Sequence, residues 1–215
     1  AFKNCTQATS VTFEGGGTSN LPASTVNFGG SIFYGCDNSS FTTVTLPTRL
    51  ISIPGAFFSE CTSLATISFE SNTSGLVTIG NGFENTAITT MKIPDTVTSI
   101  NGLNPWEKCE SLTSFTILGT PAAYSVADGV LFHVSTDTLI SYPAGKTSTS
   151  YTIPSTVKVI GYNAFSRKDL STTNPGLSGI SIPPSVITLG GGCFRGCQFT
   201  TGVVFQATSQ VATIG

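Results

Sequence analysis

One short pattern recurs along this chain of 215 residues and constrains its fold more than any other feature. The segment IPSTVKVIGYNAF at Ile153–Phe165 returns as IPPSVITLGGGCF at Ile182–Phe194 and, in part, as IPDTVTSI at Ile93–Ile100. In a repeat array each unit buries its apolar face only against its neighbours, so the units stack in one direction. The pattern therefore predicts an elongated array.

The strand-like runs within each unit set the period of the repeat. The shortest separations between successive ends are 23 and 24 residues, and the ends are Phe13, Leu46, Phe69, Ile93, Ile117, Ile153, Ile182 and Phe205. A period of this length with apolar residues in the order L-x-x-I-x-I is typical of a leucine-rich-repeat solenoid. In the run Leu64–Phe69, we expect Ile67 and Phe69 to point inward. Thr66 and Ser68 should point outward, because side chains alternate along a strand.

The residues after each strand predict how the chain returns to the next unit. A proline ends the strand because it has no N–H to donate, as at Pro47, Pro94, Pro154 and Pro183. The V-x-x-I-G runs then turn two more apolar side chains inward, and their glycines are predicted to release the chain into the return, at Gly80, Gly161 and Gly190. The next segment, A-F-x-x-C, has apolar residues spaced as in one turn of α- or 3-10 helix.

Three separations exceed the repeat, and each has a local explanation. Residues 1–46 contain Gly15–Gly17 and should form irregular N-terminal repeats. Residues 166–176 gather Arg167, Lys168 and Asp169 and should form an exposed loop. In the repeat at 118–153, the alternating runs Val130–Val134 and Thr138–Tyr142 flank a polar S-T-D turn, which predicts a β-hairpin in place of the helical return.

These observations predict the fold class and the domain organisation. We expect an α/β solenoid, a leucine-rich repeat array of 23–24-residue units. Its short strands should form one parallel sheet, with short helical or 3-10 return segments and one β-hairpin insert. Residues 1–215 should be a single domain. The chain lacks an initiator Met and both ends fall within a repeat, so we expect a fragment of a longer protein.

The composition excludes several classes of partner. Only 9% of residues are charged and the net charge is −2, so the chain has no basic patch for nucleic acid. No apolar run approaches the roughly 18–20 residues that cross a bilayer, so no membrane insertion is expected within this segment. Ser and Thr supply 61 of the 215 residues, so hydroxyl groups must build the polar faces.

The repeat also resembles a known family. IPSTVKVIGYNAF, F-x-x-C and L-x-x-I-x-I together are similar to the BspA-like, or Treponema pallidum type, leucine-rich repeat. DGVLF with LISYPAGKTSTSYTIP resembles its hairpin-containing variant. The resemblance is strongest from Phe41 to Phe205 and departs at Thr86 and Lys168, in the Cys position, and at Trp106, in the Phe position. It implies a surface-displayed or secreted protein of a host-associated bacterium or protozoan, acting in adhesion, and it carries no catalytic motif.

The cysteines and the single histidine are candidates for chemistry. The F-x-x-C position holds Cys5, Cys36, Cys61, Cys109 and Cys197, and Cys193 lies four residues before the last of these. They could form disulfides, as an extracellular setting would allow, or a column of small buried thiols. The second interpretation is favoured because Thr86 takes the same position. His133 has no G-x-S-x-G motif to serve, and no C-x-x-C is present. We expect neither an enzyme nor a cofactor or metal site.

The outward positions of the strands predict a candidate interaction face. Twelve of the sixteen positions one and three residues before the strand ends are Ser or Thr. In a solenoid they form two rows about 4.8 Å apart from rung to rung. The candidate residues are Thr43, Thr45, Thr66, Ser68, Thr90, Lys92, Ser114, Thr116, Thr152 and Ser181. The alternative is that Thr fills these sites because it suits strands.

The sequence leaves three functions open. The leading hypothesis is a non-enzymatic, adhesin-like cell-surface or secreted module. It would be a monomer that binds a protein or glycan on host matrix or on a host or neighbouring cell. The second is a structural spacer that presents another domain. The third is ordering of water by T-x-T rows, which is disfavoured because Lys92 and Val204 interrupt the rows.

Overall fold

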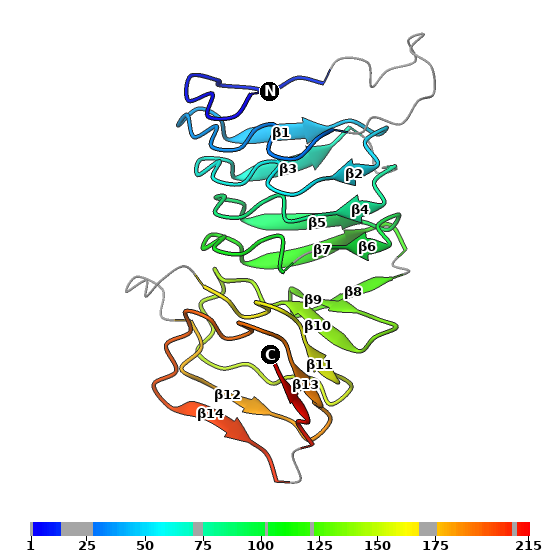
Figure 1. The fold of residues 1–215 in the computed structure, drawn as a ribbon, viewed down its shortest axis with the longest axis vertical. Coiled ribbons are helices and arrows are strands. Elements are labelled where there is room, and N and C mark those ends of the chain that lie inside the picture. Colours follow the sequence, from blue (N-terminus) through cyan, green and yellow to red (C-terminus); the bar gives the residue numbers. More distant parts are fainter. Residues whose placement is uncertain are drawn as a thin grey trace.

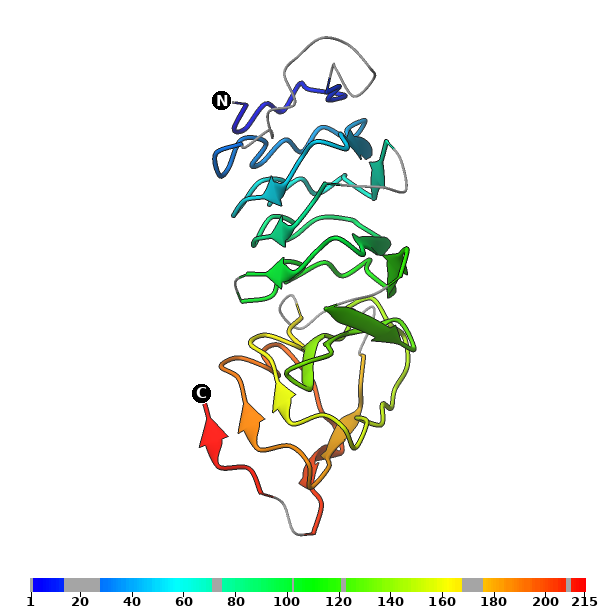
Figure 2. The same ribbon diagram turned by 90° about the vertical axis from the view of Figure 1, so that its right-hand side faces the viewer.

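The computed structural model describes residues 2–13, 28–70, 75–101, 103–120, 123–167, 176–207 and 210–215. Its coils stack along one long axis (Figures 1 and 2). The Gly15–Gly17 stretch, Lys168 and most of the predicted 166–176 loop lie outside the described residues. The described residues of that loop, Ser166, Arg167 and Gly176, are buried, so the prediction of an exposed loop is wrong for them.

The L-x-x-I-x-I runs form the first strand of each coil. These strands are β1 (Thr43–Leu46), β3 (Thr66–Phe69), β5 (Thr90–Pro94), β7 (Ser114–Leu118), β12 (Gly179–Ile182) and β14 (Gly202–Phe205). The predicted ends are correct for β1, β3, β12 and β14, and β5 and β7 each run one residue further. Of the other two predicted runs, the one ending at Ile153 forms only a parallel bridge from Thr152 to Ser181, and the one ending at Phe13 is not a strand.

The V-x-x-I runs and the equivalent L-x-x-I runs at Leu50–Ile53 and Leu76–Ile79 form a second row of strands, so the prediction of one parallel sheet is wrong. They are β2 (Ser52–Ile53), β4 (Thr78–Ile79), β6 (Ser99–Ile100), β11 (Val159–Ile160), β13 (Thr188–Leu189) and β15 (Thr213–Ile214). Parallel pairing links β2, β4 and β6, and separately links β11, β13 and β15. The two rows lie on different sides of the stack (Figure 1). A typical coil is therefore one turn of a parallel β-solenoid and contains two short strands.

The predicted hairpin forms, but it does not replace a return segment. Strand β9 (Val130–His133) pairs antiparallel with β10 (Thr138–Ser141), and β10 pairs parallel with β11 in the position of a second strand. A further strand, β8 (Tyr124–Ala127), pairs antiparallel with β9. The turn between β8 and β9 is Asp128–Gly129, with φ of 51° and 74°. Positive φ at both central residues is typical of a two-residue hairpin turn. The insert therefore lies between the first and second strands of its coil.

The return segments are not helical among the described residues, which corrects the second part of the fold prediction. Four of the described segments have a residue with positive φ at one position and another four residues later. Such pairs are Ser31 and Gly35, Ala56 and Glu60, Asn104 and Lys108, and Gly192 and Gly196. A left-handed residue cannot continue a right-handed helix. The intervening N–H groups instead bond to the next coil, as Phe33 N does to Phe57 O at 3.0 Å.

The interior contains a column of aromatic rings that follows the F-x-x-C position. Phe2, Phe33, Phe58, Phe83 and Trp106 stack from coil to coil at centroid distances of 5.4–6.4 Å. After the hairpin, Tyr142, Phe165 and Phe194 continue the series. Trp106 thus fits the Phe position, and Tyr142 is the corresponding residue of the coil that follows the hairpin.

The glycines after the second strands are required for a reason other than the predicted one. Gly80, Gly161 and Gly190 do not have positive φ. A Cβ on Gly190 would lie 2.7 Å from the carbonyl carbon of Gly161 in the preceding coil, and one on Gly80 would lie 3.1 Å from Ile53 O. These glycines therefore allow neighbouring backbones to approach closely.

Candidate interaction face

The predicted hydroxyl rows lie side by side in the N-terminal half of the stack. Parallel pairing aligns Thr43 with Thr66 and Thr45 with Ser68 on β1 and β3. It aligns Thr90 with Ser114 and Lys92 with Thr116 on β5 and β7. The β1–β3 and β5–β7 pairs are neighbours in the stack, because Thr89 N donates to Ala65 O at 3.3 Å. Eight of the ten candidate residues therefore share one four-stranded surface.

Hydroxyl groups on this surface bond to one another across the coils. Thr45 Oγ1 lies 3.1 Å from Ser68 Oγ, and Thr90 Oγ1 lies 3.4 Å from Ser114 Oγ. Just before β5 and β7 begin, Thr113 Oγ1 donates to Thr89 O at 3.0 Å. These contacts restrict the side-chain rotamers. The surface can thus present hydroxyl donors and acceptors in fixed positions, with the ammonium of exposed Lys92 as the charge on the candidate rows.

The hairpin interrupts the rows after β7. Phe115 N donates to Gly129 O at 2.9 Å, so the Asp128–Gly129 turn occupies the far edge of β7. The remaining candidates, Thr152 and Ser181, pair with each other in the C-terminal half and lie apart from the other eight. On β14, the outward Val204 is exposed together with its neighbours Val203 and Phe205. The predicted continuous face is therefore two surfaces, of which the N-terminal one is the hydroxyl-rich one.

The cysteines are free thiols in the structure, as the favoured interpretation predicts. Four of the six thiols donate to the carbonyl of the aromatic residue in the preceding coil: Cys36 to Phe2, Cys61 to Phe33, Cys109 to Phe83 and Cys197 to Phe165, at 3.0–3.1 Å. Burial raises the pKa of Cys109 to about 11 and that of Cys61 to about 12. These thiols stay protonated near neutral pH, and a protonated thiol is a poor nucleophile.

His133 lies on the hairpin and not near the hydroxyl rows. Its ring packs edge-on against Tyr124 at 5.0 Å, and its Nδ1 lies 3.4 Å from Ser135 Oγ. Together with Asp137 it lines a shallow groove of about 290 Å³ between the hairpin and Pro154–Val157. The Asp137 carboxylate there is already paired with Lys158 at 2.7 Å. The groove has mixed chemistry and does not extend the candidate face.

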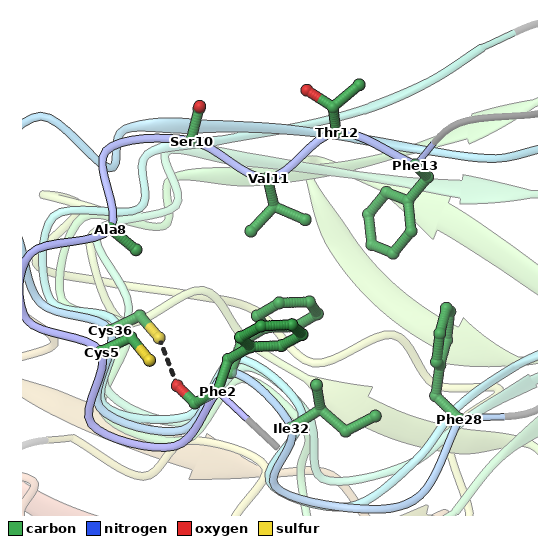
Figure 3. Close-up of a pocket in the computed structure, with 11 residues that line it drawn as sticks. Phe2, Cys5, Ala8, Ser10, Val11, Thr12, Phe13, Phe28, Ile32 and Cys36 are labelled. Carbon is green, nitrogen blue, oxygen red and sulfur yellow. Dashed lines mark hydrogen bonds between the residues drawn. The ribbon is translucent and has the colours of Figure 1, made fainter.

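An apolar cavity of about 570 Å³ lies at the N-terminal end of the stack. Ala8, Val11 and Phe13 point into it, towards Phe28 and Ile32, whereas the hydroxyls of Ser10 and Thr12 point away (Figure 3). The inward and outward positions predicted around Phe13 are therefore correct, although this run is not a strand. The lining offers a ligand apolar contact and little polar recognition.

The described residues contain neither a metal-binding cluster nor a membrane-spanning helix. No three His, Cys, Asp or Glu side chains there come together in a way that could hold a metal ion. No helix in that part of the chain is long and apolar enough to span a membrane.

Charged side chains gather at the return turns, which the sequence reasoning missed. Several of the variable residues of F-x-x-C are charged and at least partly exposed: Glu60, Glu84, Glu107, Lys108 and Arg195. Ser59, Ser166 and Arg167 occupy the same positions in other coils and are buried. Lys108 Nζ lies 2.6 Å from Glu84 Oε1, and Asn85 Nδ2 donates to Glu60 Oε2 at 2.6 Å. The signal was present in the sequence, because polar residues recur between the aromatic residue and the cysteine at the repeat period.

Comparisons with known proteins agree with this architecture. The family model described as a BspA type leucine rich repeat region matches six copies, in residues 1–113 and 144–215. The unmatched interval contains the hairpin strands β8, β9 and β10. No curated protein matches the sequence.

Several solved structures are similar to the chain. A leucine rich cell surface protein from Faecalibacterium prausnitzii is 30% identical with a TM-score of 0.69, over 81% of this chain and 43% of that one. The pneumococcal vaccine antigen PcpA is 22% identical with a TM-score of 0.67, over 79% and 40%. A leucine-rich repeat protein from Eubacterium ventriosum is 21% identical with a TM-score of 0.57, over 85% and 61%. The last two likenesses concern the fold alone, and the chain spans less than two thirds of each relative.

Proposed function

Because this chain belongs to the BspA-type leucine-rich repeat family, we propose that it is a non-enzymatic interaction module of a cell-surface or secreted protein. Its ligand is a protein or glycan on host matrix or on a host or neighbouring cell. The observation that carries the proposal is the alignment of eight hydroxyl or ammonium side chains on β1, β3, β5 and β7. The name of the relative from Faecalibacterium prausnitzii, a cell surface protein, supports the location.

The chemistry of the face sets the kind of binding. It offers hydroxyl groups and one ammonium, and none of the Trp, Tyr or Arg side chains that dominate tight interfaces. A single copy therefore binds weakly. Several copies on one surface gain effective concentration and hold a ligand that one copy would release. The module itself acts as a monomer.

A screen with multivalent protein tests this function. The chain, biotinylated at one terminus and assembled on streptavidin, is applied to purified extracellular-matrix proteins and to a glycan array. Specific retention of the assembly, and much weaker retention of the single chain, is the expected result. No retention of either form at high micromolar concentration would contradict the proposal.

A structural spacer remains the second candidate, and one observation favours it. Within each half of the stack, backbone bonds and stacked aromatic rings run from coil to coil, which suits a semi-rigid rod. A spacer binds nothing on its hydroxyl face, so its presented domain would keep full activity when Thr45, Ser68 and Thr116 are changed to Glu. The interaction module would lose ligand retention in the same variant.

A further inference from the structure

The two halves of the stack have separate cores that meet at the hairpin. One buried cluster extends from Phe33 to Tyr124 and includes Leu131, and the other extends from Val130 to Cys193. Val130 and Leu131 are consecutive residues of β9, and side chains alternate along a strand, so they face different clusters. Among the described residues, β6 is not paired with β8, and β7 is not paired with β12. Neither row of strands therefore runs unbroken through the junction.

The return turn at this junction differs from the others in its two variable residues. Tyr142 takes the aromatic position, since its ring stacks on Phe165 at 5.1 Å. Pro143 and Ala144 then stand where the other turns carry polar residues, and both are buried. Because these two side chains are small, the turn does not separate the coils on either side of it.

Side chains from the preceding turn cross this gap. Glu107 Oε2 accepts from Asn163 Nδ2 at 2.9 Å, and Glu107 Oε1 accepts from Arg195 Nη1 at 3.2 Å. Glu110 Oε2 accepts from Arg167 Nη2 at 3.0 Å. Asn104 Nδ2 donates to Asn163 O at 2.9 Å. These contacts join residues 56–88 positions apart, whereas the Lys108–Glu84 contact joins neighbouring coils 24 positions apart.

The bonds are shielded from water to different degrees. The Arg167 side chain is 8% exposed, and its other nitrogen, Nη1, donates to Ala144 O at 2.6 Å, so it also ties the intervening coil. The Glu107 side chain is 13% exposed, while Arg195 is 58% exposed. Charge-assisted bonds strengthen as solvent is excluded, and removal of one partner of a buried pair leaves an uncompensated charge.

We propose that Asn104, Glu107, Glu110, Asn163, Arg167 and Arg195 form a junction clasp that couples the two half-stacks and fixes the angle between them. The clasp spans the turn at Tyr142–Gly145, whose two variable residues, Pro143 and Ala144, are apolar. Both rows of strands are interrupted at this place. The clasp therefore keeps the hydroxyl surface of the N-terminal half in one orientation relative to the C-terminal half, whatever that surface binds.

The test uses the full chain and the double variant Glu107→Gln/Glu110→Gln. Pulsed thiol labelling along a urea titration reports unfolding of the N-terminal half at Cys61 and of the C-terminal half at Cys193. In the unaltered chain the two midpoints should coincide. In the variant the Cys193 midpoint should fall below that of Cys61, because the C-terminal core cluster is the smaller one. Small-angle X-ray scattering should show a broader distribution of end-to-end distances.

The matched control is Glu84→Gln, which removes a more exposed ion pair within the N-terminal half. Its midpoints should stay coincident. If the double variant does not fold, Arg195→Gln is the milder change, because Glu107 keeps its bond to Asn163. Coincident midpoints and unchanged scattering in the variant that folds would overturn the proposal. So would an equal separation of midpoints in Glu84→Gln.

Discussion

Replacing Ala56 with glycine should stabilise the protein, although glycine usually weakens a fold. Ala56 has a φ of 56° and lies half-buried in a return turn. A left-handed conformation costs a residue with a Cβ about 1–2 kcal/mol. The greater freedom of glycine in the unfolded chain costs about 0.5–1 kcal/mol. The difference predicts that Ala56→Gly raises the free energy of unfolding by about 0.5–1 kcal/mol.

The matched control for this prediction is Ala65→Gly. Ala65 is also half-buried and precedes β3, but its φ is not positive, so its replacement should lower the free energy of unfolding by about 0.5–1 kcal/mol. Urea denaturation at equal m-values measures both changes. Destabilisation of similar size in the two variants would refute the reasoning, because it would mean that Ala56 is not held in a left-handed conformation.

Three further predictions follow from burial and close approach. Burial raises the pKa of Cys109 from 9.0 to about 11. The protonated thiol should therefore contribute about 3 kcal/mol to the free energy of unfolding below pH 9, and this contribution should be lost as the pH rises through 11. Over this pH range the urea midpoint of the unaltered chain should fall more than that of Cys109→Ala. Gly190→Ala should cost about 1–3 kcal/mol because its Cβ would meet the Gly161 backbone. Gly55→Ala, with open space around its Cβ, should be neutral or slightly stabilising by thermal denaturation. Ile79→Ala, at a fully buried position, should cost about 2–5 kcal/mol, and Ile187→Ala, at a position 40% exposed, should cost less than half as much by the same urea assay.

The first strands could be predicted because their signal is local. Alternation in runs such as Leu64–Phe69, followed in several repeats by a proline, fixes both the position of the strand and the direction of its side chains. The hydroxyl pairs then follow, since the repeat period sets the register from one coil to the next. Thr45 and Ser68 could therefore be aligned before the structure was known.

The return turns could not be predicted because their conformation depends on neighbouring coils. Ala56 and Glu60 have no intrinsic preference for positive φ, and they adopt it because the N–H groups of alternate residues bond to the next coil. The F-x-x-C spacing fits a helical turn equally well. The second strands are only two residues long, too short for alternation to reveal them.

The junction was hidden for a different reason. Contacts between Glu107 and Arg195 depend on which coil lies opposite which, and the hairpin shifts that arrangement. Asp128–Gly129 is a strong local signal for a hairpin turn and could have revealed β8. It would also have shown that the hydroxyl rows are interrupted at β7.

The central claim, that the hydroxyl surface on β1, β3, β5 and β7 is the binding surface, is tested most directly by comparing two triple variants. One carries Glu at Thr45, Ser68 and Thr116. The other carries Glu at Ser52, Thr78 and Ser99, which form a stacked hydroxyl row on the second strands. Retention of streptavidin assemblies on the matrix proteins and glycans that hold the unaltered chain is the measurement. Loss of retention in the first variant alone is the predicted result. Equal retention by both variants would contradict the claim.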